Sequence, residues 1–180
     1  MTAEPTEPTE AMIRFYDERT HAHIARVQRC LRLLAAVTPY RDELLQRAET
    51  HDASKFTDAE RVPYIWLTEY HRCRWRNIPF AYPDGMEQRV REAVKHHVHA
   101  NRHHPEFHAD PNDMTDVDLI EMVCDWTAMA LEFDQDGGSA RGWAEQTVGK
   151  KLHFNATKRS FIFATIALLD EQLQRDASSD

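Results

Sequence analysis

The residues best suited to chemistry in this chain are imidazoles and carboxylates that lie far apart in the sequence. The dipeptide His51-Asp52 is at the centre of the pattern, with His23 before it and Asp125 after it. Four further histidines of the pattern follow the dipeptide and precede Asp125: His96, His97, His103 and His104. Imidazole and carboxylate groups are the usual protein ligands of first-row divalent metals. Ligands spread over about a hundred residues predict a metal site that is assembled by folding rather than within one loop.

Asp125 carries much of this argument because its neighbours at positions 119–126 are nearly all apolar. An unpaired carboxylate costs several kcal/mol to bury, so Asp125 needs a metal, a cation or a set of hydrogen-bond donors. Each residue alone also has an ordinary structural explanation. Asp52 could cap a helix, and Asp125 could pair with an arginine. The ordered set of histidines and aspartates favours the metal site.

The elements that must position these residues are helices. Glycine is scarce, with 5 residues, and no alternating strand pattern is present. Apolar periodicity, prolines and turn residues predict an all-α, single-domain helical bundle. Capping boxes are expected at 57–60 and at 115–118. The expected helices cover approximately residues 10–37, 40–51, 57–78, 86–104, 115–133, 140–152 and 156–175.

The helix expected at 86–104 would carry several of the candidate ligands. His97, Asn101 and His104 would share one face, because residues seven apart are two helical turns apart. His96 and His103 would share a neighbouring face. Asn101 could then orient a ligand or contact a substrate.

Length and composition limit the other possibilities. The chain of 180 residues predicts one domain at 10–176, with a disordered tail at 1–9 and a flexible end at 177–180. A net charge of -8 argues against nucleic acid as the main partner. No signal peptide or membrane-length apolar run is present, which predicts a cytoplasmic protein. The apolar final helix either closes the bundle or forms a homodimer contact. Three cysteines without a CxxC pair predict reduced thiols: Cys30, Cys73 and Cys124.

The order of these residues resembles the HD-domain superfamily of metal-dependent phosphohydrolases. His51 to Lys55 resembles the HDxxK variant of its motif, and His23 resembles the histidine of its first helix. A small, largely uncharacterised branch of that superfamily is closer still. Its marks are His-Asp-x-Ser-Lys, His-x-x-x-Asn-x-His-His and Glu-Met-x-x-Asp, which stand here at 51–55, 97–104 and 121–125.

The resemblance implies a site with one or two divalent ions, with Mn, Fe, Mg, Co and Ni as the candidates. A first ion would be held by His23, His51, Asp52 and Asp125. A second ion would be held by His97 with His104 or His103, and Asp52 would bridge the two ions. Lys55 would contact the substrate. The Gly-Tyr-Pro signature of cyclic-dinucleotide phosphodiesterases is absent.

Three functions fit this site, and the sequence does not separate them. The first is hydrolysis of a phosphate ester of a small nucleotide-like molecule, with a carboxylate-bridged metal activating water. Here Lys55, Asn101 and Arg102 would face the substrate, and Glu106 would act as general base. The second is a diiron oxygenase that acts on a small diol or phosphonate. The third is a non-catalytic binding module whose metal only braces the bundle.

Overall fold

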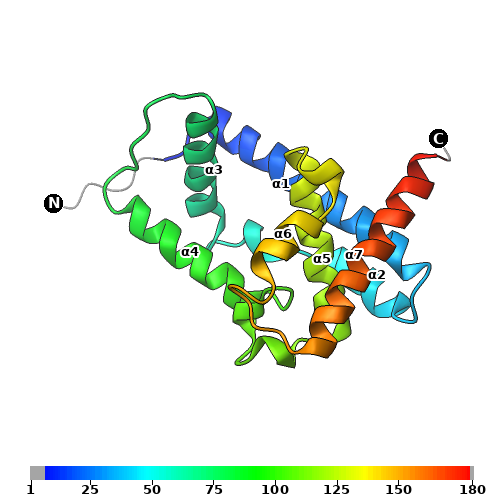
Figure 1. The fold of residues 1–180 in the computed structure, drawn as a ribbon. Coiled ribbons are helices and arrows are strands. Elements are labelled where there is room, and N and C mark those ends of the chain that lie inside the picture. The colour runs from blue at the N-terminus through cyan, green and yellow to red at the C-terminus, as the bar shows by residue number, and fades with distance from the viewer. Residues whose placement is uncertain (1–6, 179–180) are drawn as a thin grey trace. The chain divides into compact units, whose positions relative to one another are not determined.

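The computed structural model describes residues 7–178, and helices dominate them (Figure 1). The predicted all-α class is confirmed. A single isolated bridge, between Val148 and Leu152, is the only β-type pairing within these residues. A disordered tail is expected at 1–9 and a flexible end at 177–180; residues 1–6 and 179–180 lie outside the described residues, and the last helix runs to Ala177. The α-helices are α1 (Glu10–Ala35), α2 (Arg41–Thr50), α3 (Arg61–Trp75), α4 (Met86–Ala100), α5 (Asp116–Glu132), α6 (Arg141–Thr147) and α7 (Ala156–Ala177).

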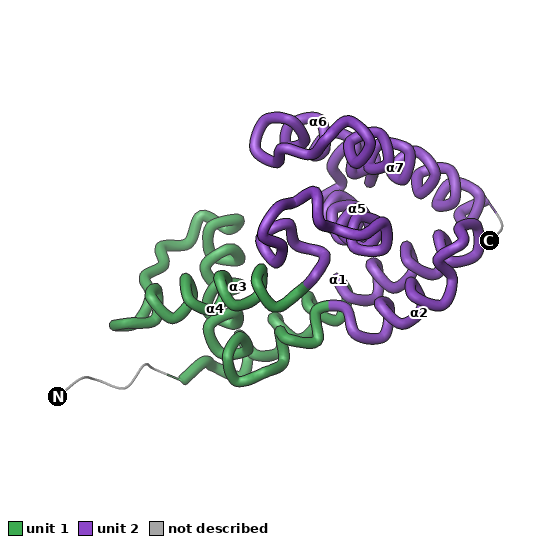
Figure 2. Tube along the Cα trace, turned by 90° about the horizontal axis from the view of Figure 1, so that it is seen from below, with its two compact units in different colours: residues 1–22, 52–101 green, residues 23–51, 102–180 purple. Residues whose placement is uncertain are grey.

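The sequence predicts one domain at 10–176, and the contacts group the described chain into two compact units (Figure 2). Unit 1 comprises the chain up to Ala22 together with Asp52–Asn101. Unit 2 comprises His23–His51 and the chain from Arg102 onward. The chain therefore passes between units at the peptide bonds that precede His23, Asp52 and Arg102. Two of these three residues are predicted metal ligands.

Each unit has a hydrophobic core of its own. In unit 1, α3 packs against α4. Its buried core residues are Met12, Tyr16, Ile65, Trp66, Met86 and Val90. In unit 2, α5 packs against α2 and α7, and ten of its residues are buried. A carboxylate on the buried side of α5 must therefore find a charged or hydrogen-bonding partner.

The capping box predicted at 57–60 is wrong. The helix begins at Arg61, and the Glu60 side chain forms no cap hydrogen bond. Its carboxylate instead accepts hydrogen bonds from Ser54, His96 and His97. Pro63 stands within the first turn of α3, where a missing N–H removes no intrahelical bond.

The helix predicted at 86–104 ends at Ala100, so the shared face of His97, Asn101 and His104 is wrong. The backbone turns extended at Asn101, with φ −111° and ψ 120°. The Asn101 side-chain amide donates to the carbonyl oxygen of His97 at 2.9 Å. The same carbonyl also accepts from the Asn101 backbone N–H at 3.2 Å, so Asn101 closes the end of the helix with two hydrogen bonds. His103 and His104 therefore lie on a loop.

The second predicted cap, at 115–118, is confirmed. The Thr115 hydroxyl accepts from the Asp118 backbone N–H, and the Asp118 carboxylate accepts from the Thr115 N–H. The three cysteines are free and buried, as expected of reduced thiols. Within residues 7–178, no helix is both long enough and apolar enough to cross a lipid bilayer.

Candidate metal centre

Unit 2 brings together two histidines and two carboxylates from three helices. Glu121 and Asp125 lie one turn apart on α5, so both side chains leave the same side of that helix. His23 belongs to α1, and His51 is the C-terminal cap of α2. Three sequence-predicted ligands, His23, His51 and Asp125, each offer a ligand atom within 4.8 Å of the other two.

Asp125 is the carboxylate at the centre of this group. Its Oδ1 lies 3.0 Å from Nε2 of His23 and 3.7 Å from Nε2 of His51. Burial raises the pKa of the Asp125 carboxyl, but the contacts with His23 and His51 outweigh burial and hold the pKa well below its ordinary value. Asp125 is therefore ionised at neutral pH, which is the form that binds a metal.

Glu121 fixes the orientation of two imidazoles. Its Oε1 lies 2.8 Å from Nδ1 of His51 and 3.2 Å from Nδ1 of His103, and its Oε2 accepts from Arg47 at 2.7 Å. Burial opposes ionisation, but the bonds from His103 and His51 lower the pKa of Glu121 to about 2. An ionised carboxylate can only accept, so Nδ1 of both imidazoles carries a hydrogen.

The contact with Glu121 also sets which group the opposite side of the His51 ring faces. With Nδ1 of His51 directed at Glu121, the opposite ring nitrogen, Nε2, faces the Asp125 carboxylate at 3.7 Å. An imidazole nitrogen and a carboxylate oxygen are both ligands of divalent metals. Ligand bonds of about 2.1 Å put two donors on one ion roughly 3–3.5 Å apart, close to the observed distance.

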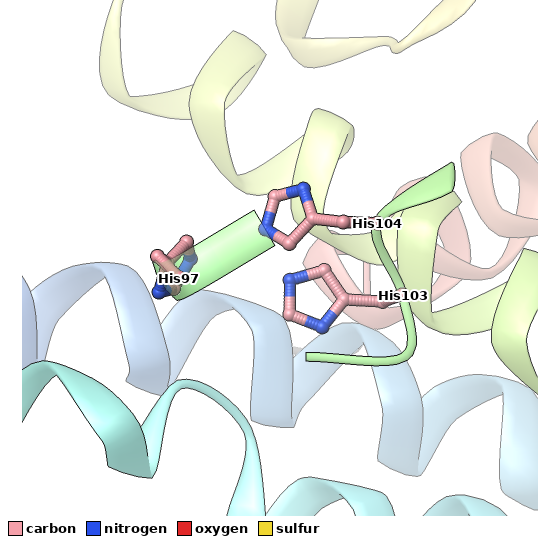
Figure 3. A group of neighbouring side chains, drawn as sticks. All are labelled: His97, His103 and His104. Carbon is pink, nitrogen blue, oxygen red and sulfur yellow. The ribbon is translucent and has the colours of Figure 1, made fainter. Parts of the chain in front are cut away.

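His103 and His104 extend the group on the loop that follows α4 (Figure 3). The His103 ring lies 4.6 Å from the His51 ring and 4.3 Å from the His104 ring, measured between centroids. His51, His103 and Glu121 also offer ligand atoms within 4.8 Å of one another. His103 is buried and His104 is partly exposed.

Unit 1 contains the other predicted ligands, Asp52 and His97. Asp52 begins a short 3₁₀ turn in the left-handed region, with φ 56°, which aspartate tolerates better than most residues. Its Oδ1 lies 3.5 Å from Nε2 of His97, and its Oδ2 pairs with Nζ of Lys55 at 2.6 Å. The structure thus brings Asp52, Lys55 and His97 together within unit 1.

Glu60 in unit 1, like Glu121 in unit 2, is a buried glutamate that contacts Nδ1 of two histidines. It is fully buried and accepts from Nδ1 of His97 at 2.9 Å and from Nδ1 of His96 at 2.7 Å. Burial raises the pKa of the Glu60 carboxyl, but the bonds from His97 and His96 give a net lowering. As with His51, the opposite ring nitrogen of His97, Nε2, then faces an aspartate, here Asp52.

Neither Glu121 nor Glu60 was identified from the sequence as a site residue. The same signal that singled out Asp125, a carboxylate within an apolar run, is present at Glu121. Glu60 gave no such signal, because its residues 57–60 resemble a helix cap. The predicted substrate residue Arg102 lies elsewhere in unit 2, with its guanidinium on Asp118 at 3.0 and 3.1 Å. Asn101 lies in unit 1 and donates to Ser54 at 2.9 Å.

A cavity of about 910 Å³ opens beside the metal group of unit 2. Asp125, His104 and Glu106 all line it. The structure therefore places the predicted general base, Glu106, on the same cavity as a predicted ligand. The volume lies within the range of cavities that hold small-molecule substrates.

Comparison with known proteins gives one result. A model of a family of unknown function, DUF5662, matches residues 12–168. The chain belongs to this family. Among curated proteins and among solved structures, none matches the chain. The DUF5662 match covers every residue discussed above as a ligand.

Proposed function

We propose that the chain is a metal-dependent hydrolase that cleaves a phosphate ester of a small nucleotide-like substrate. The observation that carries the proposal is the His51–Asp125 contact, in which an ionised carboxylate faces Nε2 at 3.7 Å beside His23. The resemblance to the HD-domain superfamily, proposed from the sequence motifs, supports the same chemistry. The assignment of Asp52 and His97 as ligands rests on that resemblance and stays a prediction.

The residues of unit 2 have separate tasks in this proposal. His23, His51 and Asp125 hold the ion, and Glu121 orients His51. A bound divalent ion would make water nucleophilic at neutral pH and stabilise charge on the phosphoryl group. Glu106, on the cavity wall, accepts the proton of the attacking water. Lys55, assigned by the resemblance, would contact the substrate phosphate.

The experiment is a phosphate-release screen with protein reconstituted in turn with Mn, Mg, Co, Ni and Fe(II). We expect Glu106→Gln to lower kcat by about a hundredfold or more while the metal content is unchanged. The control is Glu132→Gln, a carboxylate at the end of α5 that does not line the cavity. Equal activity of Glu106→Gln and wild type would contradict the role of Glu106.

The same samples separate the two other functions. A pair of irons with a mixed-valence EPR signal, together with no phosphate release, would favour a diiron oxygenase. A binding module predicts that Lys55→Ala changes no activity while His51→Ala prevents folding. The hydrolase predicts instead that Lys55→Ala weakens turnover in a folded protein.

A further inference from the structure

The cavity beside Asp125 has walls of two kinds. One part carries three residues of the predicted site: Asp125 and His104, predicted as metal ligands, and Glu106, predicted as the general base. Much of the remaining wall is apolar and comes from the second half of α5 and from α6. Its large apolar residues are Trp126, Met129, Phe133 and Trp143.

These apolar side chains are unusually accessible. The exposed fraction is 36% for Met129, 38% for Phe133 and 54% for Trp143. Large apolar side chains gathered around one cavity mark a place where a ligand removes apolar surface from water. Three of the four are aromatic and Met129 carries a polarisable thioether; all four can pack on a flat ring, and tryptophan offers the largest face.

The charged residues that line the cavity limit how much negative charge a ligand can carry. Among the described lining residues, Lys151 is the one lysine or arginine, against three carboxylates. Asp136 is already engaged, since its Oδ2 accepts from the Gly142 N–H at 2.9 Å. A polyphosphate chain needs several cationic donors, and these walls do not supply them. A bound ion and Lys151 together could neutralise the charge of a single acidic group.

We infer that this cavity binds a substrate made of one acidic group attached to an aromatic or otherwise apolar body. The acidic group lies at the Asp125 end, and the body covers Trp126, Met129, Phe133 and Trp143. A monoester of an aromatic alcohol or of a nucleoside fits this description, and a nucleoside triphosphate does not. The placement of the acidic group (the acidic half of the inference) rests on the proposed metal-dependent hydrolysis. The binding of the apolar body to the apolar wall (the apolar half) does not.

The test is calorimetric titration of the metal-loaded full chain with two non-hydrolysable probes, 1-naphthylphosphonate and methylphosphonate. We expect the naphthyl probe to bind about tenfold tighter or more, because only it covers the apolar wall. Trp143→Ala should weaken naphthylphosphonate about fivefold and leave methylphosphonate unchanged. Trp75→Ala is the matched control, since Trp75 is 48% exposed in unit 1 and does not line the cavity.

A neutral probe, 1-naphthalenemethanol, separates this inference from the proposed function. If the apolar half is right, this probe binds with and without metal, and Trp143→Ala weakens it in both states. Loss of metal binding with retained naphthalenemethanol binding would count against the hydrolase alone. Equal affinities for the two phosphonates, or equal losses in Trp143→Ala and Trp75→Ala, would overturn the inference.

Discussion

Two buried glutamates orient the candidate ligands of this chain. Glu121 holds Nδ1 of His51, and Glu60 holds Nδ1 of His97. In each case Nε2 of the same ring faces an aspartate, at 3.7 Å from Asp125 and 3.5 Å from Asp52. A carboxylate that fixes the tautomer and angle of a ligating histidine is a common feature of metal sites.

The role of Glu121 can be tested by Glu121→Gln. We expect the affinity for a divalent metal to fall by about 10–100-fold, because the amide holds the imidazoles less firmly. Metal affinity is measured by competition with a coloured chelator. Asp118→Asn is the control, since it also removes a carboxylate partner of Arg47 but belongs to none of the candidate ligand groups. A similar loss of affinity in both variants would show that Arg47, rather than the histidines, carries the effect.

Asp118 itself makes stability depend on pH. Burial raises the pKa of its carboxyl, but hydrogen bonds from Arg102, Thr115 and Arg47 give a net lowering from 3.8. A lowered pKa stabilises the fold above the unfolded value of 3.8, and this stability is lost as pH falls through the folded value. At neutral pH we expect Asp118→Asn to cost about 3 kcal/mol, the lower end of the cost of breaking a buried ion pair, because Arg102 is partly exposed.

Urea denaturation at pH values from about 7 down to about 3 checks this prediction. The difference in free energy of unfolding between wild type and Asp118→Asn should be constant above about pH 5 and should shrink below about pH 4. A difference that stays constant over the whole range would mean that Asp118 is not held ionised by its arginines.

The ordered motifs, through their resemblance to the HD-domain superfamily, group His23, His51 and Asp125 in the sequence, and the structure brings these three together. The same motifs do not predict the two glutamates as site residues. With 30 acidic residues in the chain, one more glutamate carries little information until its burial is known. Asp125 was identified because its apolar neighbours in the sequence predict a largely buried position.

At the scale of single elements, helix type was predictable and helix ends were not. Apolar periodicity located α1, α4 and α5, since a repeat near 3.6 residues persists over many turns. The end of α4 depends on one side chain, because the Asn101 amide bonds to both the His97 carbonyl and Ser54. Ser54 is 47 residues away in the sequence, so no local pattern could reveal that partner.

The capping box of α5 gives a prediction at this scale, since α5 carries both Glu121 and Asp125. Thr115→Ala removes the hydroxyl that accepts from the Asp118 N–H, and we expect a loss of about 1 kcal/mol in the free energy of unfolding. Urea denaturation measures this loss in the free energy of unfolding. Thr50→Ala is the control, because that exposed hydroxyl only donates to a carbonyl of its own helix. Equal effects in both variants would contradict the importance of the cap.

At the scale of the whole molecule, the all-α class followed from scarce glycine, helix-forming composition and the lack of alternating patterns. The grouping into two units with separate cores did not, because it depends on which distant segments pack together. The chain moves between units directly before His23, Asp52 and Arg102. Two of these three residues, His23 and Asp52, are predicted metal ligands, so each lies at the point where the chain leaves one unit and enters the other.

The central claim is that His23, His51 and Asp125 bind a metal ion. The decisive measurement is the metal content of anaerobically purified protein, compared between wild type, Asp125→Asn and His99→Ala. His99 is an exposed histidine that bonds only to its own helix, so its variant controls for loss of an imidazole. We expect about one or two divalent ions per chain in wild type and His99→Ala, and a loss of at least one ion in Asp125→Asn. A folded wild-type protein without metal, or full metal retention in Asp125→Asn, would contradict it.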